Sequence, residues 1–283
     1  MYSQGITRLH RTAFVIAIDL SGSMAEPIKV GREHKTKAEW VCDTANTLLF
    51  ELVERARRSD GIHDYYDVAV IGYSGEGVKP LLGEEWFQNI AQIEQCPHSH
   101  KVHIQKREAP DGNPVLLKMV RPAWITPCAQ GKTPMYEALC EIYAHLKEWV
   151  NDPRHRESFP PIVFNITDGE ASDCDEEALL DIASQIRSLR TIVGEVLLVN
   201  IHISSNTLIP SCTFPASSEE VAGNRYATLL YEASSPMPSQ FEPLICEMKR
   251  SWVKGPFRGM SYNSTIHELA LMLNIGSISI PIH

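Results

Sequence analysis

One carboxylate and two hydroxyls stand close together early in the chain, in Asp19-Leu20-Ser21-Gly22-Ser23. They follow the apolar run 13–18, and such a run, without polar alternation, is typical of a strand buried on both faces of a parallel sheet. Gly22 allows a sharp bend after this strand. In open α/β sheets, ligands bind at the carboxyl ends of the strands. Because carboxylates and hydroxyls are ligands of hard cations, we expect a divalent cation at this turn.

Two later segments offer oxygen ligands of the same kind. Thr133 stands in Gly131-Lys132-Thr133-Pro134-Met135-Tyr136, and Asp168 ends a second apolar run, 162–167, just before Gly169. The three segments in this order resemble the D-x-S-x-S turn, the Thr loop and the strand-ending Asp of the von Willebrand factor A (vWA) family. In that family these residues form a metal-ion-dependent adhesion site, or MIDAS. The resemblance covers most of the chain in order and spacing.

The ligand chemistry and the resemblance together predict a role for each of these residues. We assign Ser21 and Ser23 as direct hydroxyl ligands of Mg²⁺, with Mn²⁺ as an alternative. The resemblance implies that Asp19 and Asp168 act through water or hydrogen bonds, and that Thr133 binds the ion directly when a partner is held tightly. Since the direct ligands are mostly neutral, the ion keeps positive charge and one position for a partner's Asp or Glu carboxylate.

Helix capping is the simpler alternative for each residue taken alone. Asp19 and Ser21 could cap the first helix, and Thr133 could cap the helix that is expected to begin at Pro134. Capping does not explain why two aspartates end two different apolar strands with a Thr loop between them.

The segments around these residues predict an α/β fold with a doubly wound, mostly parallel central sheet flanked by helices, of the vWA or Rossmann-like kind. A single vWA domain is expected over residues 10–275. The expected strands are 13–18, 66–73, 78–82 at an edge, 162–167, 195–204 and, last in the sheet, 226–232. The expected helices are 36–58, 84–95, one beginning at Pro134, 174–190, 239–250 and 265–273.

Residues 96–122 do not fit a helix and are expected to form a hairpin-like insertion around the turn signal 109–114. This insertion departs from the simple domain and could add a specificity surface near the Thr loop. Its first part carries Cys96, His98, His100 and His103, which are potential zinc ligands. On an extended chain His98 and His100 share a face and His103 takes the other, so a solvated loop is the favoured interpretation.

Other chemistries are less well supported. Gly131-Lys132-Thr133 resembles the end of a phosphate-binding loop, but Thr126 stands where that motif needs its first glycine. A D-x-D phosphatase motif would need a second aspartate where Ser21 stands. No arrangement of nucleophile and base is evident, so no catalytic residue is predicted. The carboxylates of Asp173, Asp175, Glu176 and Glu177 are interpreted as charges favoured by a helix N-terminus rather than as calcium ligands.

Composition, net charge and cysteine count limit the expected cellular location and the expected classes of partner. The 283 residues are 43% hydrophobic, enough for a sizeable core, and the formal net charge of −9 disfavours nucleic acid or an anionic membrane as the main partner. No apolar run approaches the roughly 20 residues that span a bilayer, and residues 1–11 lack a secretory signal. Seven scattered cysteines, none in a C-x-x-C pair, favour a cytoplasmic protein.

The expected function is a non-enzymatic, cation-dependent protein-interaction module. Residues 224–238 and 257–263 resemble stand-alone intracellular bacterial vWA proteins of the tellurium-resistance type. That resemblance implies a stress or signalling assembly with a protein kinase or a metal-dependent phosphatase as partner. The alternatives are a magnesium-dependent phosphohydrolase and a vWA subunit of an ATP-driven chaperone or chelatase complex.

Overall fold

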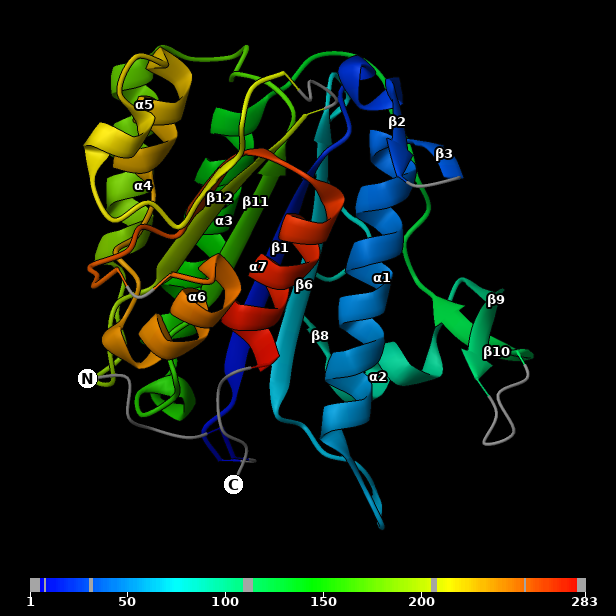
Figure 1. The fold of residues 1–283 in the computed structure, drawn as a ribbon. Helices are drawn as coiled ribbons and strands as arrows, with labels where there is room; N and C mark the ends of the chain where they lie inside the picture. The colour runs from blue at the N-terminus through cyan, green and yellow to red at the C-terminus, as the bar shows by residue number, and fades with distance from the viewer. Residues whose placement is uncertain are drawn as a thin grey trace.

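The computed structural model describes residues 6–7, 9–30, 33–108, 114–204, 208–251 and 253–278. Its main sheet has the order β13-β14-β12-β11-β1-β6-β7, with β8 also paired to β6 (Figure 1). Five neighbouring strands are parallel: β14 (Met260–Ser264), β12 (Leu197–Ile203), β11 (Ile162–Thr167), β1 (Thr12–Asp19) and β6 (Tyr66–Ser74). Three short strands pair antiparallel: β7 (Gly77–Pro80), β8 (Gln88–Asn89) and β13 (Cys212–Thr213).

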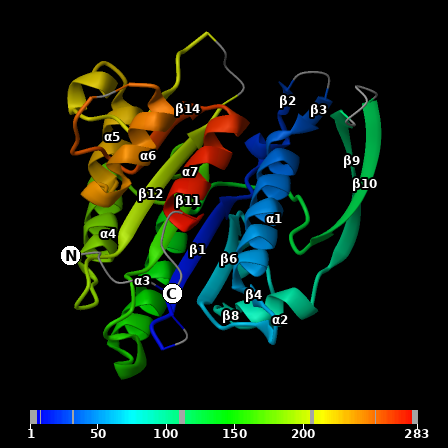
Figure 2. The same ribbon diagram turned by 60° about the horizontal axis from the view of Figure 1, so that its bottom comes forward.

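Helices cover both faces of this sheet, as Figures 1 and 2 show. Along β1, Phe14, Ile16 and Ile18 enter one hydrophobic cluster while Val15 and Ala17 enter the other, because successive side chains of a strand point to opposite faces. The first cluster is completed by α1 (Lys37–Ala56), α2 (Ile90–Gln95), α6 (Glu242–Lys249) and α7 (Ile266–Ile278). The second is completed by α3 (Met135–Asn151), α4 (Glu176–Ser188) and α5 (Arg225–Ala233). The predicted doubly wound α/β fold is confirmed.

The predicted insertion is a two-stranded hairpin of β9 (Ser99–Glu108) and β10 (Pro114–Ala123); its turn, 109–113, lies outside the described residues. Figures 1 and 2 show it beside α1, on the side away from α7. Asp43 on α1 accepts from Lys101 of β9 at 2.7 Å and from Lys35 at 3.0 Å. Asn46 fixes the exit of the hairpin, since its Oδ1 accepts from the backbone N–H of Trp124 and of Ile125. The insertion is therefore attached to the first half of α1.

Smaller elements complete the chain. Lys35 belongs to a hairpin of β2 (Pro27–Val30) and β3 (Glu33–Thr36), which precedes α1. A second short hairpin, formed by β4 (Arg57–Arg58) and β5 (Gly61–Ile62), follows α1. In the part of the chain that the structure describes, 3₁₀ helices occupy Gly22–Ala25, Pro153–His155, Ser218–Val221 and Ser239–Phe241.

Two of the expected elements were wrong. Residues 226–232 lie in helix α5 and not in a strand, because Tyr226, Leu229, Leu230 and Ala233 bury one helical face and Asn224 caps the first turn. The last strand of the sheet is instead β14. The helix expected over 84–95 is confined to α2, because Gln88 and Asn89 pair with β6 and Asn89 caps the short helix. The single-domain span 10–275 stays a prediction.

Candidate metal centre

The predicted site lies at the carboxyl ends of two neighbouring parallel strands. β1 ends at Asp19 and β11 at Thr167, with Ile18 of β1 in register with Ile166 of β11. The turn after β1 is bonded to the Thr loop, because the N–H of Gln130 donates to the carbonyl of Leu20 at 2.7 Å. The N–H of Gly22 likewise donates to the carbonyl of Gly131 at 3.0 Å. Three segments that are distant in sequence thus meet at one edge of the sheet.

Hydrogen bonds join four of the five predicted residues into one connected set. The Oγ atoms of Ser21 and Ser23 are 3.1 Å apart, and Ser23 Oγ donates to Asp168 Oδ1 at 2.6 Å. Asp19 Oδ1 accepts from the N–H of Ser21 at 2.8 Å, and Asp19 Oδ2 accepts from Thr167 Oγ1 at 2.9 Å. The two hydroxyls therefore lie between the two strand-ending carboxylates.

Thr133 reaches the site through its loop. Its backbone N–H donates to Ser172 Oγ at 3.1 Å and its carbonyl accepts from the same hydroxyl at 3.0 Å, which ties the loop to the segment after Asp168. Gly131 has a φ of +77° and packs its backbone on that of Gly75. Within the described residues, the Thr133 hydroxyl makes no hydrogen bond with the other four side chains. The structure therefore places Thr133 beside the connected set and not within it.

The capping alternative does not account for these residues. Thr36 caps α1 with a capping box completed by Glu39, so neither Asp19 nor Ser21 serves that helix. Ser21 begins the 3₁₀ helix Gly22–Ala25 without a side-chain cap bond. The start of α3 is served by Asp173, whose carboxylate accepts from the N–H groups of Tyr136 and Glu137.

Lys37 is a member of this site that the sequence did not reveal. Its ammonium lies 2.9 Å from Asp168 Oδ2 and 2.6 Å from Glu26 Oε2. The side chain of Lys37 is 6% exposed and that of Asp168 is fully buried. Burial alone would lower the pKa of Lys37, but the hydrogen bonds to Glu26 and Asp168 outweigh it, so the pKa is raised and the ammonium stays charged. A lysine in the first turn of a helix is ordinarily solvated, and nothing in its spacing points to Asp168.

The two strand-ending carboxylates sit in different electrostatic surroundings. Asp168 forms an ion pair with Lys37, which it shares with Glu26, whereas Asp19 forms no ion pair with any cationic side chain of the described residues. Burial raises the pKa of Asp19, and the neighbouring Asp168 charge acts in the same direction against its hydrogen bonds. A buried, uncompensated carboxylate next to two hydroxyls fits a divalent cation, whose charge would offset the cost of burying Asp19.

The donor set is one of hard oxygens. Among the described residues, no group of three His, Cys, Asp or Glu side chains is placed to hold a metal ion. Cys96, His98 and His100, the possible zinc ligands of the insertion, therefore do not form a metal-binding group among the described residues. The side chain of His103 lies outside those residues. Asp175 caps α4, as its carboxylate accepts from the N–H of Ala178 at 2.9 Å. A cation at the strand ends would thus be bound by hydroxyls, carboxylates and water, as Mg²⁺ prefers.

Comparisons with known proteins add a likeness of fold. No protein-family model matches the sequence, and no curated protein matches it. Among solved structures, the chain is similar to a von Willebrand factor type A structure from Catenulispora acidiphila, with 13% identity and a TM-score of 0.41 over 69% of this chain. It spans only 34% of that structure's length. The SpRpn10 VWA domain is 12% identical with a TM-score of 0.44, over 80% of this chain and 83% of that one.

A third similar structure contains three N-terminal domains of the type V pili tip protein Mfa5 from Porphyromonas gingivalis. It is 11% identical with a TM-score of 0.28, over 57% of this chain and 20% of that one. Likeness at these values does not carry an argument about function, so membership of the vWA family stays a prediction. In the part of the chain that the structure describes, no helix is both long and apolar enough to cross a bilayer.

Proposed function

We propose that the chain is a non-enzymatic module that binds a protein partner through a divalent cation, Mg²⁺ or Mn²⁺, at the centre formed by Asp19, Ser21, Ser23, Thr133 and Asp168. The observation that carries this proposal is the run of bonded oxygens from Ser21 through Ser23 to Asp168. Hydroxyls are poor ligands for soft metals and have no reason to converge on buried carboxylates for packing alone. A hard dication supplies that reason.

Each residue has a distinct part in holding the ion. Ser21 and Ser23 supply direct hydroxyl ligands, and Thr133 is poised on the adjoining loop to supply a third. Asp19 orients the Ser21 turn through its backbone N–H and compensates the ion's charge at close range. Asp168 accepts from Ser23, which directs the hydroxyl lone pairs away from itself and toward the ion.

The partner is proposed to offer an Asp or Glu carboxylate. Lys37 pairs with both Asp168 and Glu26, and the proposed direct ligands are neutral hydroxyls, so a dication there keeps positive charge at its open position. An incoming carboxylate would replace a water on that ion, which is a strong interaction in a partly dry crevice. The resemblance noted above further suggests a kinase or phosphatase as partner, in a bacterial cytoplasmic stress assembly.

The first test is a magnesium titration of the purified chain, followed by thermal unfolding and by calorimetry. The chain should bind Mg²⁺ and unfold at a higher temperature in its presence, and the double variant Ser21→Ala/Ser23→Ala should lose both responses while still folding. Ser218→Ala/Ser239→Ala is the matched control, because these two serines are exposed and lie away from the site. Equal magnesium responses in both double variants would refute the metal centre.

The second test concerns the partner. A protein captured from cell extract by the wild-type chain with Mg²⁺ should be lost with chelator and with Ser21→Ala/Ser23→Ala. Replacing acidic residues of that protein one at a time should identify a single carboxylate whose loss abolishes binding. Turnover of a phosphoester that is lost in Asp19→Asn would instead identify a phosphohydrolase and contradict the non-enzymatic proposal.

A further inference from the structure

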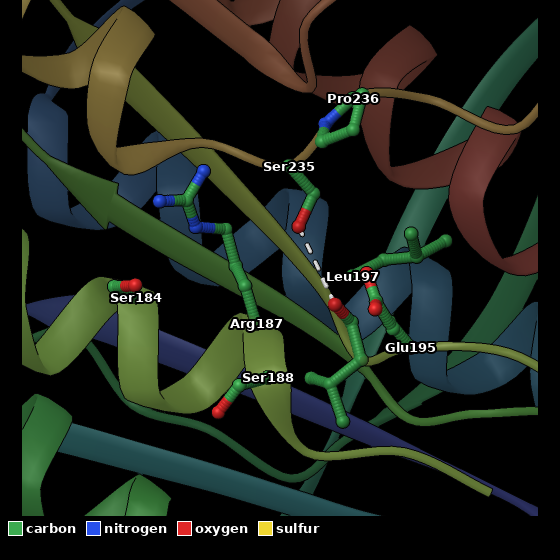
Figure 3. A pocket seen from close by; sticks show the side chains of 8 residues that line it. Ser184, Arg187, Ser188, Glu195, Leu197, Ser235 and Pro236 are labelled. Carbon is green, nitrogen blue, oxygen red and sulfur yellow. Dashed lines mark hydrogen bonds between the residues drawn. The ribbon is translucent and has the colours of Figure 1, made fainter.

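A cavity of about 260 Å³ lies beside the N-terminal end of β12, at the opposite end of the sheet from the metal centre. Figure 3 shows Arg187 rising from α4 into this space, toward the segment that carries Ser235. Ser184 and Ser188 stand on the same side of α4, three residues before and one after the arginine. The lining residues are Ser184, Arg187, Ser188, Glu195, Val196, Leu197, Ser235 and Pro236.

Two guanidinium groups meet at the carbonyl of Ser234, next to the cavity: that of Arg187, which lines it, and that of Arg258, which does not. Nη1 of Arg187 and Nη1 of Arg258 each donate to the carbonyl oxygen of Ser234 at 3.0 Å, so the two nitrogens lie within twice that distance of each other. Arg258 reaches this point from a segment that pairs with Pro236 on the cavity wall, and its guanidinium lies over the ring of Tyr231. Within the described residues, neither arginine has a carboxylate within 4.0 Å.

This pair places two positive charges on one carbonyl oxygen, with Glu195 as the neighbouring carboxylate. Ser234 is the C-cap of α5, and one cation suffices to satisfy the carbonyl at a helix C-terminus. Burial lowers the pKa of Arg187, the neighbouring Arg258 charge lowers it further, and the Glu195 charge acts in the opposite direction. In the described part of the chain, Nη2 of each arginine has no hydrogen-bond acceptor. The chain as a whole is acidic, so this pair of arginines is a local concentration of positive charge, which Glu195 offsets in part.

We propose that this cavity binds a phosphoryl group, either free or as a phosphate monoester, on Arg187, with Arg258 as the neighbouring positive charge. The planar guanidinium presents paired donors that match two oxygens of a phosphoryl group, and a dianion would relieve the repulsion between the arginines. Ser184, exposed one helical turn before Arg187, can donate its hydroxyl to a third oxygen. The hydroxyls of Ser188 and Ser235 are already bonded to Gln185 and to β12. The small volume suits a single phosphoryl group and not a nucleotide.

Glu195 limits the affinity of this cavity. Its carboxylate lines the same space and opposes an anion, so a singly charged ligand such as acetate should bind poorly and a dianion should bind best above its second pKa. Glu195→Gln removes that opposition and leaves both arginines in the chain. This variant is therefore expected to bind phosphate about threefold more tightly.

The test is calorimetric titration of the full chain with inorganic phosphate, a short phosphoserine peptide, its unphosphorylated form and acetate, all with chelator present to keep the metal centre out of the measurement. Arg187→Gln and Arg258→Gln should each weaken binding of inorganic phosphate by about tenfold or more. Arg190→Gln is the matched control, since Arg190 is exposed just beyond the same helix. The phosphoserine peptide binding more tightly than phosphate identifies a phosphoprotein as the source of the group, and equal binding identifies a free anion.

Three results would overturn this proposal: no phosphate binding at millimolar concentration, an equal loss in Arg190→Gln, or weaker binding in Glu195→Gln. Glu195→Gln also controls for misfolding, because a variant with a damaged cavity would not bind phosphate more tightly than the wild-type chain. The outcome is independent of the metal centre. Ser21→Ala/Ser23→Ala should leave phosphate binding unchanged whether or not it abolishes magnesium binding.

Discussion

The ammonium of Lys37 lies 2.9 Å from Oδ2 of Asp168, and both side chains are withdrawn from solvent. This pair joins the first residue of α1 to the residue that follows β11, across 131 positions of sequence. It also places a permanent positive charge beside a site proposed to hold a dication. The site is thus partly charge-balanced before any metal binds.

Lys37→Met should destabilise the metal-free chain, because it leaves the Asp168 carboxylate buried without a cation. Removing one partner of a buried ion pair costs about 3–5 kcal/mol. Excess Mg²⁺ should restore part of this loss, since the dication would take over the compensation of Asp168, and magnesium affinity should rise because a repelling charge is gone. Urea unfolding with chelator and with Mg²⁺, together with calorimetry, measures both effects.

Lys35→Met provides the comparison for that variant. Lys35 also forms two ion pairs, with Glu33 and Asp43, but it is one-third exposed and lies outside the site. Its loss should cost at most about 1 kcal/mol and leave magnesium affinity unchanged. The double variant Lys37→Met/Asp168→Asn should be more stable than Lys37→Met alone. If Lys37→Met behaves like Lys35→Met, the pair does not balance the site.

Asp19→Asn should separate stability from metal binding. The amide can keep both contacts of Asp19, with its oxygen accepting from the N–H of Ser21 and its nitrogen donating to Thr167 Oγ1, which itself donates to the carbonyl of Gly169. The variant removes a buried charge whose pKa is raised by burial, so the metal-free chain should be as stable as wild type or more stable, by about 1 kcal/mol. The stabilisation by Mg²⁺ should disappear. A metal-free variant that is several kcal/mol less stable would show that the Asp19 charge is already compensated.

Gly131→Ala should disturb the Thr loop. Its Cβ would lie 2.8 Å from both Cα and N of Gly75, and its φ of +77° is unfavourable for alanine. The variant is expected to lose about 2–4 kcal/mol of stability and to bind Mg²⁺ more weakly, because Thr133 moves with its loop. Gly223→Ala is the control, with a φ of +93° but no atom within 4 Å of the added Cβ. It should lose about 1 kcal/mol and keep its magnesium response; equal effects on magnesium in both variants would contradict the positioning role of the loop.

The strands that carry the site were predictable because their chemistry is local. β1 and β11 are short runs buried along their whole length; β1 ends at Asp19, and Asp168 directly follows β11. β14 could not be found this way, because it contains the polar residues Ser261 and Ser264. Their hydroxyls can be buried because they form hydrogen bonds with each other and, for Ser261, with Thr213. The run 226–232 is compatible with strand or helix until Asn224 is known to cap it.

The site, like the fold, has residues that could be predicted from local sequence and others that could not. Oxygen ligands at strand ends follow from the order of segments, so four of the five residues could be brought together from sequence. The pairing of Lys37 with Asp168 could not, because it joins residues 131 positions apart and depends on how α1 is placed against the sheet. The position of Thr133 relative to the ion depends likewise on the Gly75–Gly131 contact.

His202 should make the stability of the chain depend on pH between neutrality and about pH 4. The ring stacks on Tyr262 at 4.6 Å, and its Nδ1 accepts from the N–H of Asn263, which needs the neutral imidazole. Burial lowers the pKa of His202 from its ordinary 6.5 to about 4, although the Asp168 charge acts the other way. Because the folded-state pKa is below the unfolded one, the stabilisation is present above pH 6.5 and is lost as the pH falls toward 4. Between pH 7 and pH 5 the wild-type chain should therefore lose about 2 kcal/mol more than His202→Asn, measured by urea unfolding with chelator present. The exposed His100 offers the control, since His100→Asn should retain the full pH dependence; a wild-type chain that loses no more stability than His202→Asn over this range would show that His202 titrates normally.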